Sequence, residues 1–159
     1  MGNLIIYLGC FPALSQKHPL NLVLLFLFTL AESYIVAFIC GLYEPKIVVA
    51  AAVVTAAATI GLTLYAVYTK SDFTTWWSCL NGIAWGAFLM IILLSVMNIW
   101  FIHNPFVSNL IAVVFGLIYM AYLVIDTQLI VGKGKHQITL DNYVLGAIFI
   151  YIDIIGLFL

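Results

Sequence analysis

The sequence predicts an all-α, polytopic transmembrane helix bundle, and three observations carry this prediction. The chain of 159 residues is 66% hydrophobic and only 7% charged, whereas a soluble domain carries roughly 25% charged residues. Its apolar residues form long runs and show none of the alternation expected of lipid-facing strands. The polar connections between these runs are short, so the backbone has little freedom to form anything but packed helices.

Five apolar runs are long enough to cross a bilayer, because a helix needs about 20 residues to span it. Their expected bounds are 19–42, 47–68, 76–100, 106–131 and 141–159, within a single transmembrane helical domain covering 1–159. The stretch 1–14 is apolar but too short to span, and it lacks the basic start of a signal peptide. We expect it to form the last turns of a partial N-terminal helix.

Helix boundaries are marked by local signals. Asp72 precedes the third run, Pro105 opens the fourth, and Thr139 or Asp141 can cap the fifth. The sequence "GKGK" at 132–135 places glycine and positive charge at the end of the fourth run, as a helix C-terminus prefers. These signals support the five expected spans.

Small residues predict which helices approach one another closely. The second run, 47–68, is rich in Ala and Thr, and small residues allow membrane helices to pack tightly. We therefore expect it to be the central, buried helix of the bundle. Gly82 and Gly86 form a GxxxG pattern in the third run, which predicts a further packing contact.

Lysine placement predicts the orientation in the membrane. With connections alternating between the two sides, Lys17, Lys70, Lys133 and Lys135 fall on one side and Lys46 on the other. The positive-inside rule assigns the side with four lysines to the cytoplasm. The connection after the fourth run is then cytoplasmic.

Composition also limits the functions that the chain can have. Its net charge is −1 and it contains no Arg, which excludes the basic face that nucleic-acid binding requires. The cysteines, Cys10, Cys40 and Cys79, form no CxxC and have no histidine at zinc-site spacing. We expect no bound cofactor.

Three acidic residues, Glu32, Asp126 and Asp153, lie within the expected spans. A carboxylate at the centre of a membrane helix costs about 2.5–3.5 kcal/mol on insertion scales. All five lysines lie in connections or at span ends, so these acids have no cationic partner inside the bundle. They must be protonated, share protons, or contact water and a bound cation.

Helical periodicity places two tyrosines beside the first aspartate. Tyr119 and Tyr122 share the face of Asp126 at spacings of seven and four, and the Tyr122 hydroxyl can be offered to the carboxyl. These tyrosines and Glu32 are candidate cavity-lining residues. For Glu32 the alternative is a protonated acid hydrogen-bonded to Thr29 or to a neighbouring helix.

The second aspartate is flanked by glycines, because Gly146 and Gly156 share a helix face with Asp153. They allow the fourth run to come close. The last two runs are joined by a short connection and should be antiparallel neighbours, so Asp126 and Asp153 can meet. Two carboxyls in low dielectric cannot both ionise cheaply, and such a pair titrates as a unit. Ideal helices place them about 10 Å apart in depth, so contact requires tilt or a later helix start.

Four segments of the chain have a familiar pattern: "HPLNLVLLFLFTLAESYIVAF" (18–38), "GLTLYAVYTKSDFT" (61–74), "GLIYMAYLVIDTQLI" (116–130) and "DNYVLGAIFIYIDIIGLFL" (141–159). Their most specific features are Asp-Thr-Gln in one helix followed by Tyr-x-Asp-Ile-Ile in the next. These segments resemble the transmembrane BAX-inhibitor-motif family, in its lifeguard and Golgi anti-apoptotic protein-like branch. The resemblance implies a seven-helix bundle, of which this chain holds five full spans and a partial helix, lacking the first helix and most of the second.

The resemblance also implies a function. It indicates a pH-sensitive, calcium-permeable leak channel of endoplasmic reticulum or Golgi membranes that regulates calcium homeostasis and cell death. Asp126 and Asp153 would be the pH sensor and gate, and would contact calcium weakly and transiently as the permeant ion. Two departures from the family are Ile125, where Tyr or Phe is common, and the lack of an Arg that could latch the two aspartates.

Two alternatives remain open at this stage. The chain could be a non-conducting interaction protein that binds cell-death regulatory proteins in the lipid bilayer. It could also be an intramembrane aspartyl protease, since such catalysis needs one acid and one base that share a proton. The residues before Asp153 are "IYI" and not the Gly-x-Gly of presenilin-type proteases, so we expect no enzymatic activity.

Overall fold

The computed structural model describes residues 19–102, 104–132 and 143–159, and all regular secondary structure in these ranges is helical. The elements are α3 (Leu20–Cys40), α4 (Pro45–Tyr68), the 3-10 turn η1 (Thr74–Trp76), α5 (Trp77–Met97), the π-helical turn η2 (Asn98–Ile102), α6 (Pro105–Val131) and α7 (Tyr143–Phe158). Four helices are long and apolar enough to cross a membrane, and α7 is a shorter apolar helix. The predicted fold class is confirmed. The expected partial helix 1–14 lies outside the described residues.

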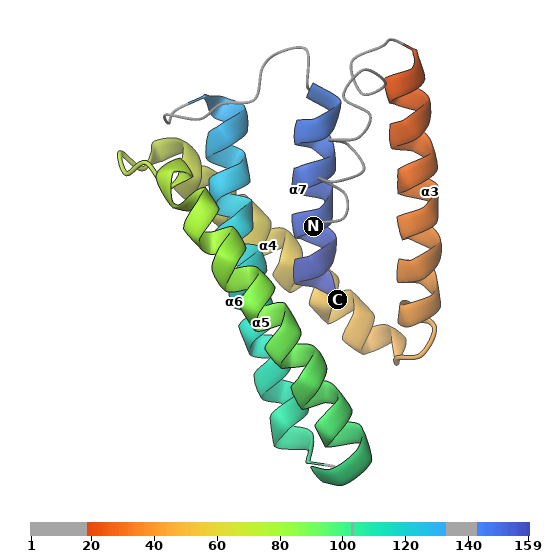
Figure 1. The fold of residues 1–159 in the computed structure, drawn as a ribbon. Coiled ribbons are helices and arrows are strands. Elements are labelled where there is room, and N and C mark those ends of the chain that lie inside the picture. Colours follow the sequence, from red (N-terminus) through yellow and green to blue (C-terminus); the bar gives the residue numbers. More distant parts are fainter. Residues whose placement is uncertain (1–18, 103, 133–142) are drawn as a thin grey trace.

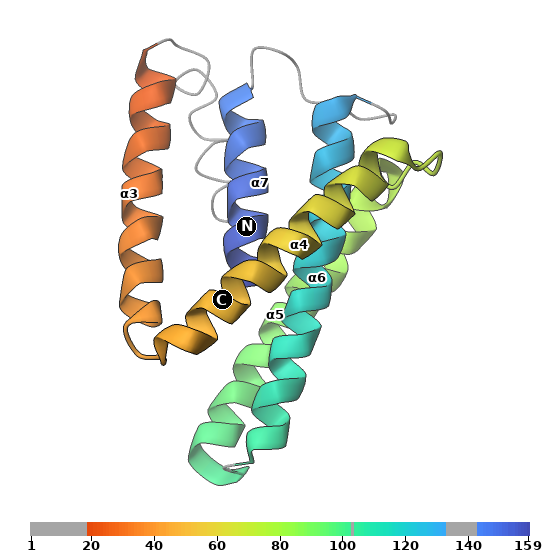
Figure 2. The ribbon, with the colours of Figure 1, turned by 180° about the vertical axis from the view of Figure 1, so that it is seen from behind.

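Helix α7 stands between α3 and α6 (Figure 1). Its most extensive packing is against α6, and it also contacts α3 and α4. Seen from behind, α4 crosses obliquely over α6 (Figure 2). The core lies where α4, α6 and α7 meet, and the part of α6 from Tyr122 to Leu129 is buried on all sides.

The prediction of a central, buried second helix is wrong. Within α4 only Thr55 and Ala66 are buried, while residues such as Val53 and Val54 are largely exposed. The small side chains let α4 come close to α6 at one crossing, and the rest of its surface faces outward. Hydrophobicity could not separate these cases, because lipid-facing and protein-facing helix surfaces are equally apolar.

The expected GxxxG contact is also not found among the described residues. A Cβ added to Gly82 or Gly86 would meet no atom within 4 Å. These glycines of α5 therefore leave an open strip on the helix.

The ends of α6 follow the local signals in the sequence. Asn104 caps its start by accepting a hydrogen bond from the amide of Phe106 at 2.9 Å, and Pro105 occupies the first turn. Gly132 ends the helix with φ of 71°, a left-handed conformation that glycine adopts without strain. The expected cap at Thr139 or Asp141 lies outside the described residues.

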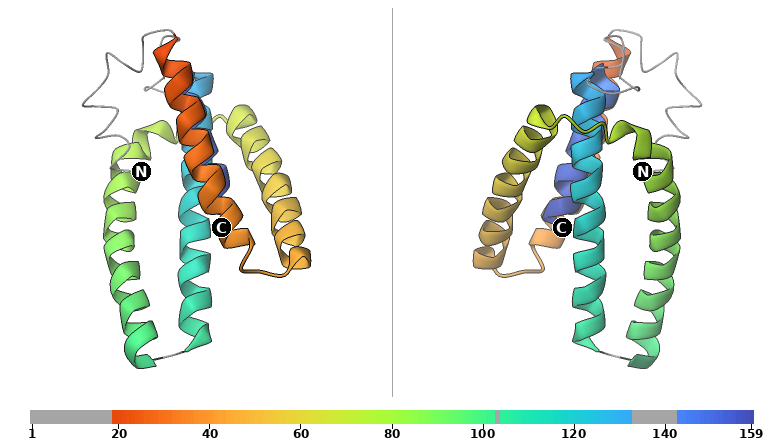
Figure 3. Two further views of the ribbon diagram at one scale, coloured as in Figure 1. Left: turned by 90° about the vertical axis from the view of Figure 1, so that its right-hand side faces the viewer. Right: turned by 90° about the vertical axis from the view of Figure 1, so that its left-hand side faces the viewer.

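A polar bracket closes the hairpin of α5 and α6, which run side by side (Figure 3). Asn98, in η2, donates to the hydroxyl of Ser108 at 2.9 Å and accepts from the amide of Asn104 at 2.8 Å. Asn98 is itself buried. Its one side chain thus ties the end of α5 to both the turn and the first part of α6.

Replacing this bracket should loosen the hairpin. We expect Asn98→Leu to lower the free energy of unfolding by about 1 kcal/mol, because polar contacts between membrane helices contribute about 0.6 kcal/mol each on average. Ser108→Ala removes one of the two bonds and should cost about half as much. Thermal unfolding in detergent measures both, and equal stabilities for all three proteins would contradict the bracket.

Candidate functional site

The two aspartates of the candidate site lie on neighbouring helices, Asp126 on α6 and Asp153 on α7. Asp126 is only 2% exposed and Asp153 is 0% exposed, and their two carboxyl groups are close enough to interact with each other. The Oδ1 atom of Asp126 and both carboxyl oxygens of Asp153 are enclosed without a donor among the described residues. Ionised carboxylates only accept, so a bond between them forms only when one carries a proton. We call these two residues the aspartate pair.

The register of α6 against α7 explains how the pair forms despite the expected offset in depth. A Cβ on Gly156 would overlap the ring of Tyr119, so the backbone of α7 lies directly on that ring. Gly156 follows Asp153 by three residues, whereas Tyr119 precedes Asp126 by seven. The two Cα positions therefore differ by about 6 Å along antiparallel axes. Helices α6 and α7 are not parallel (Figure 1), and the aspartate side chains extend beyond their Cα positions.

The expected hydrogen bond from Tyr122 to Asp126 is not formed. The Tyr122 hydroxyl donates instead to Oδ1 of Asn81, on α5, at 2.8 Å. Its single proton is thus used between α5 and α6, although the ring remains within electrostatic range of both aspartates. Asn81 lies on α5, and its amide oxygen is a neutral acceptor. The sequence pattern of α6 alone could not predict that Tyr122 bonds to a residue of another helix.

Tyr119 and Glu32 lie on the side of the pair that faces α3. Tyr119 is half-buried, stacks on Phe115 with ring centroids 6.4 Å apart, and lies within electrostatic range of Asp153 and Glu32. The hydroxyl of Thr29 donates to the carbonyl of its own helix residue Leu25 at 2.8 Å. This bond uses the proton of the Thr29 hydroxyl, and the alternative in which a protonated Glu32 donates to Thr29 stays a prediction.

Two contacts hold α3 beside α7 and so position Glu32. Near the first turns, the Asn21 amide donates to the hydroxyl of Tyr143 at 3.1 Å. Further along both helices, Phe28 of α3 meets Tyr151 of α7 edge to face with ring centroids 5.9 Å apart. The structure thus brings the acid of α3 to the same side as the aspartate pair, and its role as a cavity-lining residue stays a prediction.

Gln128 is the site residue that the sequence reasoning missed. It is 1% exposed and bonds only to backbone atoms outside its own helix. Its Oε1 accepts from the amide of Phe73 at 2.8 Å, and its Nε2 donates to the carbonyls of Ser71 at 2.9 Å and Ala66 at 3.4 Å. The sequence did contain a signal for it, because Gln128 is a polar amide within an apolar run and follows the intramembrane acid Asp126 by two residues.

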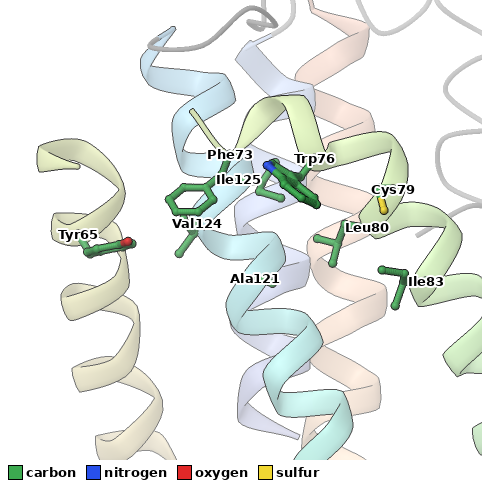
Figure 4. A pocket seen from close by; sticks show the side chains of 9 residues that line it. All are labelled: Tyr65, Phe73, Trp76, Cys79, Leu80, Ile83, Ala121, Val124 and Ile125. Atoms are coloured by element: carbon green, nitrogen blue, oxygen red, sulfur yellow. The ribbon is translucent and has the colours of Figure 1, made fainter. Parts of the chain in front are cut away.

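A cavity of about 320 Å³ lies beside this part of α6 (Figure 4). Its lining is almost entirely apolar and contains no charged residue. Aromatic side chains come from α4 and from the α4–α5 connection, and Val124 and Ile125 form the wall next to Asp126. The lining residues are Tyr65, Phe73, Trp76, Cys79, Leu80, Ile83, Ala121, Val124 and Ile125.

The two aspartates are the acidic groups that the candidate site offers to a cation. No group of three or more His, Cys, Asp or Glu side chains gathers in the described part of the chain. The aspartate pair offers four carboxyl oxygens, whereas Ca²⁺ takes six to eight oxygen ligands. Any calcium contact at the pair would depend on water and on further oxygen atoms.

The sequence of the chain is similar to those of several known proteins. The chain is 33% identical to Protein lifeguard 3 of Homo sapiens over 153 residues, covering 95% of this chain and 48% of that protein. It is 32% identical to Protein LIFEGUARD 1 of Arabidopsis thaliana over 150 residues, covering 92% and 60%. It is 34% identical to the Golgi anti-apoptotic protein of Vaccinia virus (strain Lister) over 144 residues, covering 91% and 57%.

The chain thus spans about half the length of these relatives. No solved structure matches it. The model of the Bax1-I family, described as inhibitor of apoptosis-promoting Bax1, matches residues 1–159. With this match over its whole length and an all-α membrane fold, the chain belongs to the Bax1-I family.

Proposed function

We propose that this chain is a pH-sensitive, calcium-permeable leak of endoplasmic reticulum or Golgi membranes that contributes to calcium homeostasis and to the suppression of cell death. The observation that carries the proposal is the aspartate pair, two buried and interacting carboxyl groups on membrane helices that pack against each other. Membership of a family described as an inhibitor of apoptosis-promoting Bax1 supports the role in cell death. Catalysis is not part of the proposal.

The gate follows from the chemistry of the pair. One shared proton joins the two carboxyl groups and holds α6 against α7. Loss of that proton leaves two negative charges at close range in a medium of low dielectric, which repel each other strongly. Because the two groups titrate as a unit, the proton occupancy of the pair decides how closely these helices approach.

Calcium would pass the pair without being held there. Two carboxylates together with water and nearby carbonyl or phenol oxygens make an incomplete coordination shell for Ca²⁺. Weak coordination favours conduction, since an ion must leave as readily as it enters. Glu32 and Tyr119, which lie toward α3, are the residues we propose to line the same route.

Calcium flux through the purified chain tests the proposal. Protein-containing vesicles loaded with a calcium indicator should admit Ca²⁺ faster than protein-free vesicles, and the rate should change from about pH 6 to about pH 8. Flux equal to that of protein-free vesicles at every pH would overturn the leak. Suppression of cell death that persists without flux would then favour a non-conducting interaction protein.

A further inference from the structure

We propose that Gln128 is a positioning residue of the gate. It clamps the α4–α5 junction, residues 66–76 including the last residues of α4, onto α6 and thereby holds α6 where Asp126 meets Asp153. The inference rests on the proposed function for its consequence in conduction, but the clamp and its effect on the aspartate pair can be measured without any flux.

The clamp is a complete set of hydrogen bonds. Both ends of the Gln128 amide are used: Oε1 accepts from Phe73, and Nε2 donates to Ser71 and Ala66. Since Gln128 is fully buried, water cannot replace these partners, and breaking them leaves polar groups unpaired in an apolar environment. The junction is therefore strongly biased toward its docked position.

The junction that Gln128 grips is itself ordered by local bonds. The carboxylate of Asp72 accepts from the amide of Thr74 at 3.0 Å and from its hydroxyl at 2.5 Å, and Thr74 is buried. Phe73 meets Tyr65 of α4 with ring centroids 6.2 Å apart. The clamp thus connects α6 to a preformed turn, so movement of one is transmitted to the other.

The aspartate pair and the clamp act on α6 from different sides. Residues two apart in an α-helix point about 200° away from each other around the axis, so Asp126 faces α7 and Gln128 faces the junction. Figure 4 shows Phe73 and Trp76 of the junction beside Val124 and Ile125 of α6. Moving α6 away from α7 either strains the clamp or carries the junction along.

The first test measures the clamp itself. Gln128→Met keeps a similar length but makes no hydrogen bonds, and it should raise amide hydrogen exchange at Phe73 roughly tenfold. Gln128→Glu keeps the acceptor for Phe73 and loses the donor, so its increase should be smaller. Thr127→Val is the matched control, because that buried hydroxyl donates only to Leu123 of its own helix. Unchanged exchange at Phe73 in Gln128→Met would refute the clamp.

The second test measures positioning without conduction. With the native cysteines replaced by serine, Asp126→Cys and Asp153→Cys report by their rate of disulfide formation how often the two positions meet. Adding Gln128→Met should slow this reaction several-fold, whereas adding Thr127→Val should not. An unchanged rate, in a protein whose Phe73 amide is deprotected, would show that Gln128 only stabilises the fold.

The third test links positioning to the proposed leak. In a chain with the native aspartate pair, Gln128→Met should shift the midpoint of the flux–pH curve by about half a unit to one unit. A curve identical to that of the wild type would overturn the role in gating. If the wild type itself shows no flux, the leak proposal fails, while the exchange and disulfide experiments still decide the positioning role.

Discussion

Asp126→Asn should abolish the pH dependence of calcium flux, and Asp153→Asn should do the same. Asparagine has the shape of a protonated aspartate but does not titrate, so either substitution leaves the pair unable to become doubly charged. We expect wild-type flux to change by roughly tenfold across neutral pH, which corresponds to a coupling of about 1.4 kcal/mol between protonation and opening. At every pH, each asparagine variant should conduct at the rate that the wild type shows at the acidic end of the pH series.

Glu32→Gln provides the control for these variants. It also removes an acid from a membrane span, but from α3 and outside the aspartate pair, so the flux–pH curve should keep its shape while its amplitude falls. Vesicles with matched protein content and a buffered pH series measure all three proteins. A pH curve that is unchanged in both asparagine variants would remove the aspartate pair from the mechanism.

Gly156→Leu should strongly destabilise the packing of α6 on α7, and far more than Gly116→Leu on α6. A Cβ at this position already overlaps the Tyr119 ring, so a leucine must displace either the ring or the backbone of α7. Overpacking of this kind costs about 1–3 kcal/mol. Thermal unfolding in detergent should show the loss, and disulfide formation between cysteines at 126 and 153 should slow.

A second substitution shows whether the cause is steric. Tyr119→Ala removes the ring that the leucine would strike, so the double variant with Gly156→Leu should recover much of the lost stability. Gly116→Leu is the control on α6, because a Cβ there meets no atom within 4 Å. Destabilisation by Gly116→Leu as large as that by Gly156→Leu would indicate a general intolerance of leucine and not a specific contact.

The spans and the aspartate pair could be predicted from the sequence because both depend on large energies that act locally. A membrane helix requires a long apolar run, and each observed helix begins and ends within a few residues of its expected span. An unpaired acid in such a run is costly enough to demand a partner. No base lies among the intramembrane residues, but Glu32 is a further acid, so the choice of Asp153 as the partner of Asp126 rests mainly on the family resemblance.

The side-chain partners between helices could not be predicted in this way. The proton of Tyr122 goes to Asn81 and the amide of Gln128 goes to the α4–α5 junction, contacts that join residues 41 and 55 positions apart. Periodicity shows which residues share a helix face, but not which helix covers that face. The burial of α4 was mispredicted for the same reason. Small side chains indicate that another helix can approach α4 closely, but not along how much of α4 it packs.

The clamp has a consequence for how the family can vary. Every partner of Gln128 is a main-chain atom, of Ala66, Ser71 or Phe73, so side chains along the junction can be exchanged without removing a single bond. A homologue that keeps glutamine at position 128 can therefore replace side chains along the junction and still form these bonds. Covariation methods would find no signal linking these segments, because a contact that uses only the backbone leaves no compensating substitution to detect.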